Sequence, residues 1–141
     1  MKVNWGAILL AAIVNFGFGA VWFVTFLHLW LAGTRMSPEE QQLWMTHPSF
    51  WPRIISILCS IGMALVMSWV MGISCRFSFF RGLVTGLMVG IVAALAMITE
   101  LAFELRSSND MFIAAAYPLI GCVLMGIVIG VWKPKGAPAD S

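Results

Sequence analysis

Two glutamates near the end of an apolar stretch are the residues best suited to chemistry in this sequence. Glu100 and Glu104 are four positions apart, so on a helix their carboxylates lie one turn apart on the same side. Ionisable side chains within or near a membrane span are costly and tend to mark functional sites. Such a pair can share a proton, coordinate a cation, or form a structural ion pair with Arg106 or Arg53. The sequence leaves these roles open.

The other residue types that carry chemistry lack the spacing of known motifs. His28 and His47 belong to neither an H-x-x-x-H nor an H-E-x-x-H pattern. The sequence contains no G-x-S-x-G motif. Cys59, Cys75 and Cys122 form no C-x-x-C pair. We therefore expect no metal and no cofactor, and an enzyme is the less favoured class.

The composition indicates a protein that lies in a membrane. Of the 141 residues, 61% are hydrophobic and 10% are charged, whereas roughly a quarter of an average soluble domain is charged. The formal net charge is only +2, without a basic run, so nucleic acid is not an expected partner. We expect one all-α integral membrane domain over residues 1–141, in contact with membrane lipids.

Four apolar stretches mark the expected spans, because a transmembrane helix needs roughly 20 apolar residues. The stretches cover about residues 3–31, 52–74, 79–105 and 111–132. After the first, Ser37, Pro38 and Glu40 have the spacing of a capped helix start, which predicts a short helix at about 38–46 in an outer loop. Residues 134–141 are expected to be disordered. The predicted fold is a four-helix membrane bundle.

The basic residues predict the orientation of this bundle. With four spans, both chain ends lie on the same side of the membrane as the turn between the second and third spans. That side carries Lys2, Arg76, Arg81, Lys133 and Lys135, whereas the other carries Arg35, Arg53 and Arg106. Because basic residues favour the cytoplasmic side, both termini are expected in the cytoplasm.

Small residues predict two helix-packing faces. They recur every four positions as Gly82, Gly86 and Gly90 in the third span and as Gly126 and Gly130 in the fourth. Such stripes let helix backbones approach closely. At roughly 100° per residue, positions about 18 apart point the same way, so Glu100 and Glu104 are expected on the glycine face, toward protein. In the fourth span, we expect either the glycine face or the opposite face, which carries Tyr117, to pack against a second copy in a homo-oligomer.

The first two spans carry polar residues on their expected inner faces. Asn15 and Trp22 point within about 20° of one direction on a helix. Asn15 lies near the middle of its span, where an unpaired amide is costly, so it should hydrogen-bond to a neighbouring helix or bind a ligand. One side of the second span carries Ser56, Ser60, Met63, Met67 and Ser74.

Ordered features along nearly the whole chain resemble one bacterial family. They are Asn4-Trp5, Asn15-Phe16, Gly19 and Trp22, followed by Phe103-Glu104-x-Arg106, Ala116-Tyr117, Leu124-Met125-Gly126 and Gly130-x-Trp132. This pattern resembles the small membrane proteins of the domain of unknown function 1761 family. The resemblance implies four spans in a bacterial cytoplasmic (inner) membrane and no known activity. It also implies that Glu104, Arg106 and Tyr117 belong to a recurring pattern.

We expect the protein to bind, or to help move, a lipophilic or small ligand. The candidate ligand-binding residues are Asn15, Trp22, Glu100, Glu104 and Tyr117. One alternative is a membrane-embedded enzyme that acts on a lipid-like substrate with Glu100 or Glu104 as acid/base. Another is an accessory subunit whose glycine faces dock a larger partner. A pocket at the outer end of the bundle favours the first two classes, whereas a flat, packed interior favours the third.

Overall fold

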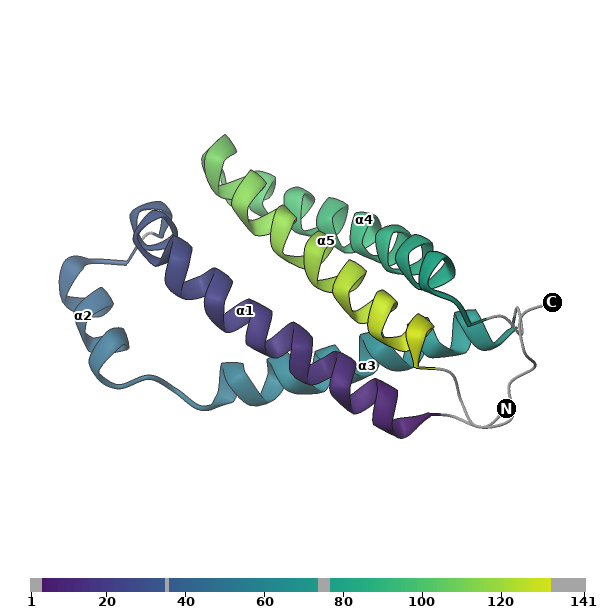
Figure 1. The fold of residues 1–141 in the computed structure, drawn as a ribbon. Coiled ribbons are helices and arrows are strands. Elements are labelled where there is room, and N and C mark those ends of the chain that lie inside the picture. Colours follow the sequence, from purple (N-terminus) through teal and green to yellow (C-terminus); the bar gives the residue numbers. More distant parts are fainter. Residues whose placement is uncertain (1–3, 35, 74–76, 133–141) are drawn as a thin grey trace.

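The computed structural model describes residues 4–34, 36–73 and 77–132, and within them the chain is all-α (Figure 1). Its helices are α1 (Trp5–Gly33), α2 (Pro38–Thr46), α3 (Trp51–Ile73), α4 (Phe79–Phe103) and α5 (Ser108–Val131). All except α2 are long and apolar enough to cross a membrane. The expected all-α fold and the four long apolar candidate spans are thus confirmed, whereas the tail expected at 134–141 lies outside the described residues.

The short helix α2 is capped at its start and packs against the end of α1. The Ser37 hydroxyl accepts a hydrogen bond from the Glu40 N–H, and the Glu40 carboxylate accepts one from the Ser37 N–H, which completes the capping box. The Trp44 ring of α2 lies 5.5 Å from that of Trp30 and 5.7 Å from that of Phe23, both on α1. These aromatic contacts hold α2 beside α1 (Figure 1).

The helix α5 begins earlier than the sequence pattern predicts. The span was expected from about Met111, with a cap within Ser108-Asn109-Asp110. In the structure the Ser107 hydroxyl accepts from the Asp110 N–H at 3.2 Å, so the helix starts at Ser108. Adjacent serines are equally good caps by residue type, and Asp110 in the first turn interacts favourably with the helix dipole. Residue type therefore does not decide whether Ser107 or Ser108 caps the helix, and the local geometry does.

The two glycine stripes pack against each other, which makes α4 and α5 the most extensive helix pair in the described structure. A Cβ atom on Gly86 would lie 2.8 Å from the Cα of Val123, and one on Gly126 would lie 2.9 Å from the Cα of Gly86. Gly82 likewise faces the Gly126 backbone, and Gly130 faces Gly82. Of the two faces expected for a second copy, the glycine face is already covered, because each stripe packs against the other. The homo-oligomer itself stays a prediction.

The core lies between α1, α3 and α5. Its buried members include Ile8, Ala11, Ala64, Met67, Met71, Cys122, Met125 and Ile129. At one end of the bundle, the Asn4 side chain donates to the Trp132 carbonyl at 3.1 Å, so the start of α1 and the end of α5 meet there. The opposite end, which carries the connections around Thr34 and Glu104, is called the loop end below.

Candidate functional site

The structure places the predicted site residues in separate regions. Asn15 and Tyr117 lie at the interface between α1 and α5, and Trp22 stacks beside Phe18 on α1. Glu104 lies at the loop end and lines a cleft. Glu100 is exposed on α4 and is not among the residues that line this cleft. The five residues therefore do not form a single site.

A polar cluster, formed by the buried Asn15 and Ser60 and the half-buried Ser56 and Tyr117, joins three of the spans. Asn15 is 3% exposed, and its amide nitrogen donates to the Ser60 hydroxyl at 2.8 Å. The Ser60 hydroxyl in turn donates to the Ser56 carbonyl at 2.8 Å. The Tyr117 side chain interacts with those of Ser56 and Asn15. The predicted hydrogen bond from Asn15 to a neighbouring helix is confirmed, and it connects α1 to α3.

Aromatic rings continue this interface toward the loop end. The Trp22 ring centroid lies 5.5 Å from that of Phe18 and 4.6 Å from that of Phe26. The Phe18 ring stacks on Tyr117 of α5 at 6.0 Å. A Cβ atom on Gly19 would lie 2.8 Å from the Tyr117 hydroxyl oxygen, so the absence of a side chain there makes room for the tyrosine. Tyr117 thus packs against α1 through Phe18 and Gly19, and Trp22 stacks beside Phe18 on α1.

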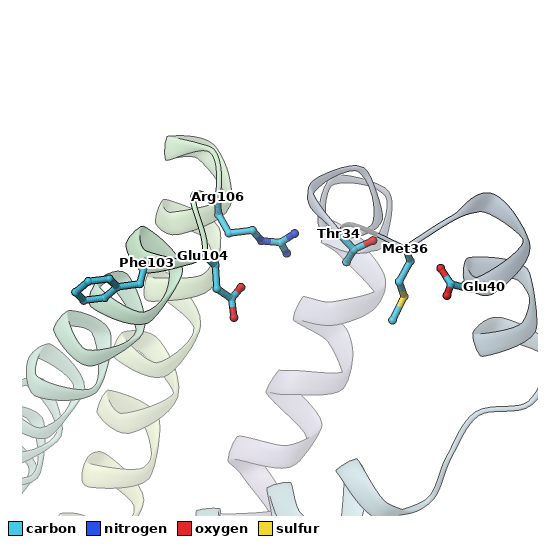
Figure 2. A pocket seen from close by; sticks show the side chains of 6 residues that line it. All are labelled: Thr34, Met36, Glu40, Phe103, Glu104 and Arg106. Atoms are coloured by element: carbon cyan, nitrogen blue, oxygen red, sulfur yellow. The ribbon is translucent and has the colours of Figure 1, made fainter.

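An open cleft of about 530 Å³ lies at the loop end, between the α1–α2 connection and the α4–α5 connection. Its lining residues are Thr34, Met36 and Glu40 on one side and Phe103, Glu104 and Arg106 on the other. Figure 2 shows Glu104 and Arg106 extending across the gap toward Thr34 and Met36, while the Phe103 ring points away from it. The cleft therefore combines carboxylates and a guanidinium with the apolar side chain of Met36.

The end of α4 brings Glu104 and Arg106 into the same cleft. On a continuous helix, residues two apart point in nearly opposite directions. Here the Leu105 N–H bonds to the Ala102 carbonyl and the Arg106 N–H bonds to the Leu101 carbonyl, both at 3.1 Å. This pattern is a Schellman motif, with Leu105 in the left-handed conformation at a φ of 57°. The chain reverses there, so both charged side chains face α1.

Glu40 contributes a carboxylate that is fixed by its own helix. The Ser37 N–H donates to one Glu40 carboxylate oxygen at 2.7 Å. This backbone hydrogen bond, together with the Ser37 side chain, lowers the pKa of the Glu40 carboxyl below its ordinary value. Because the hydrogen bonds favour the charged form, the cleft keeps a negative charge on the α2 side at neutral pH.

The expectation that both glutamates face protein is wrong for Glu100, which is exposed on α4, whereas the turn at the helix end directs the exposed Glu104 toward α1. Each four-residue step rotates by about 40° around a helix, so the buried stripe that ends at Ala94 has already drifted. The packed side continues through Met97 and Leu101, which are half-buried. The glutamates lie at the edge of that side. Only the turn at the end of α4 directs Glu104 into the cleft.

Several lining residues were not singled out from the sequence as site residues. Thr34 and Met36 follow the first span, and Glu40 was identified only as a helix cap. Their position just beyond the end of an apolar stretch indicates that they lie near the membrane boundary. It does not indicate which other segment they face. Among the described residues, no group of three His, Cys, Asp or Glu side chains is placed to hold a metal ion.

Comparison with known proteins gives one match. A family model described as "Protein of unknown function (DUF1761)" matches residues 6–130. No curated protein and no solved structure matches the chain. The matched segment extends from the first turn of α1 to the last turn of α5 and includes every residue that lines the cleft.

Proposed function

Because the chain belongs to the DUF1761 family of proteins of unknown function, we propose its function from its own structure: it binds a small amphiphilic molecule in the loop-end cleft. The observation that carries this proposal is the mixed lining of the cleft. Met36 offers apolar surface beside the charged groups of Glu40, Glu104 and Arg106. Ligand sites in proteins combine apolar walls with a few placed polar groups in this way.

The position of the cleft also supports an amphiphilic ligand. It lies where two candidate spans, α1 and α4, end, and span ends lie near the boundary between hydrocarbon and water. A molecule bound there keeps its polar group among the charged side chains and its apolar part beside the helices. The described residues of α1 and α4 share no extensive contact surface, so no tight helix pair blocks the space between them.

The same proposal assigns a membrane and an orientation. We place the chain in the cytoplasmic membrane of a bacterium, with both termini in the cytoplasm and the loop end on the outer side. The distribution of basic residues supports this orientation. The contact between Asn4 and Trp132 supports a common side for both ends. The cleft then takes its ligand from the outer leaflet or from the outer solution.

Co-purification tests the binding proposal. The protein is extracted gently, and its bound small molecules are identified by mass spectrometry. Met36→Trp fills the cleft and should abolish retention of a specific molecule. Met45→Trp is the matched control, because Met45 lies on α2, is 49% exposed against 38% for Met36, and does not line the cleft. Equal retention by the two variants would contradict the proposal.

The two glutamates provide a second matched pair. Glu104→Gln changes a lining residue, whereas Glu100→Gln removes the same charge one turn away outside the cleft. We expect Glu104→Gln to reduce ligand retention at least several-fold and Glu100→Gln to leave it unchanged. Thermal unfolding of both variants separates loss of the ligand from loss of the fold. Reduced retention by Glu100→Gln alone would place the site elsewhere on α4.

A further inference from the structure

One polar atom in the cleft is buried and has no hydrogen-bond partner in the described structure: the Nε atom of Arg106. Buried polar groups in native proteins are nearly always paired, and each exception requires an explanation. Arg106 extends from the α4–α5 connection toward Thr34, into the cleft (Figure 2). Its guanidinium carries a permanent positive charge and only donors, so its complement is an acceptor, ideally a negatively charged one.

The other polar side chains that line the cleft are already engaged. The Thr34 hydroxyl donates to the Leu31 carbonyl at 2.8 Å. The Glu40 carboxylate accepts from the Ser37 N–H at 2.7 Å. Glu104 also takes part in an interaction. Arg106 is therefore the lining residue with a buried hydrogen-bonding atom left to offer to a bound molecule.

Resting on the proposed function, we infer that the bound amphiphile carries a phosphate or carboxylate group that accepts a hydrogen bond from Arg106 Nε. Guanidinium groups bind such groups through charge-assisted, often paired, hydrogen bonds. Glu40 and Glu104 lie in the same cleft and would repel a purely anionic head group. An ammonium group on the same molecule offsets this repulsion. The ligand class is therefore a zwitterionic head group that combines an acidic group with an ammonium.

A titration with defined probes tests this assignment. The detergent-solubilised full chain is examined by native mass spectrometry with phosphatidylethanolamine, phosphatidylglycerol and diacylglycerol that have the same acyl chains. Free glycerophosphoethanolamine is the fourth probe and serves as the head group without its lipid. The variants are Arg106→Gln and, as a matched control, Arg53→Gln. Arg53 is an exposed arginine on α3, beside the Phe50 ring and outside the cleft.

We expect phosphatidylethanolamine to bind the wild type most tightly. Arg106→Gln should weaken this binding about tenfold, as for the loss of a hydrogen bond to a charged group, while Arg53→Gln leaves it unchanged. The binding of diacylglycerol should not change in Arg106→Gln, because this lipid has no acidic group. If only glycerophosphoethanolamine shows the dependence on Arg106, the acidic partner is a free small molecule rather than a lipid.

The remaining outcomes separate failure of this inference from failure of the proposed function. Equal weakening of diacylglycerol and phosphatidylethanolamine by Arg106→Gln would overturn recognition of an acidic group and leave the cleft as a binding site. Equal binding of phosphatidylglycerol and phosphatidylethanolamine would overturn the ammonium part. If Met36→Trp changes the binding of no probe, the cleft itself is not the site. Should Arg106→Gln unfold, Arg106→Lys keeps the charge but not the planar donor group, and it should still weaken binding.

Discussion

At the level of single residues, Leu105 occupies a backbone conformation that suits glycine better. Its φ of 57° places a leucine side chain in the left-handed region, which costs roughly 1–2 kcal/mol. The side chain is 84% exposed, so it gains little packing in return. We expect Leu105→Gly to raise the free energy of unfolding by about 1 kcal/mol, measured by thermal unfolding in detergent. A lower stability for this variant would show that the leucine makes contacts outside the chain.

The hydrogen bond between Asn15 and Ser60 is the buried part of the polar cluster. Interhelical hydrogen bonds in membranes couple by roughly 0.5–2 kcal/mol. A double-mutant cycle with Asn15→Ala and Ser60→Ala should therefore give a coupling energy in this range. Additive effects of the two substitutions would mean that the bond does not stabilise the fold.

Among the helices, the α4–α5 pair depends on the glycine stripes. Gly86→Ala adds a Cβ atom 2.8 Å from the Cα of Val123, which cannot move independently of its helix. We expect a loss of about 1–3 kcal/mol from overpacking. Gly62→Ala is the matched control, because a Cβ atom there would meet nothing within 4 Å. Alanine is also the better helix former, so this control should be neutral or slightly stabilising. Similar effects of the two substitutions would place the close contact elsewhere.

The sequence was sufficient to predict the elements but not the cleft. Long apolar stretches and the Ser37–Glu40 spacing identify helices, because these signals are local. Asn15 could be expected to find a partner, since an unpaired amide in a span is costly. The cleft is lined by residues before and within α2 on one side and by residues at the end of α4 on the other, and no local sequence pattern specifies that they lie close together. The exposure of Glu100 could not be predicted, because helical angles alone do not show where packing ends.

For the whole molecule, four spans require both termini on one side. The hydrogen bond between Asn4 and the Trp132 carbonyl places the start of the first span beside the end of the last span. Reporter fusions after Ser141 and at Arg76 should therefore both report the cytoplasm, and a tag near Gln42 should report the outer side. Opposite signals at all three positions would show that the protein has the reverse orientation in the membrane. Different signals at Ser141 and Arg76 would contradict the number of spans.

Binding of a small amphiphile in the loop-end cleft is tested most directly by crosslinking in living cells. A photoreactive amino acid replaces Met36 in the cleft or, as the control for bulk lipid, Met45 on α2. After irradiation, mass spectrometry of the purified chain should show one discrete small-molecule adduct at position 36 that is absent at position 45. The adduct should decrease when Glu104→Gln is introduced. No adduct at position 36, or the same distribution of lipids at both positions, would contradict the proposed function.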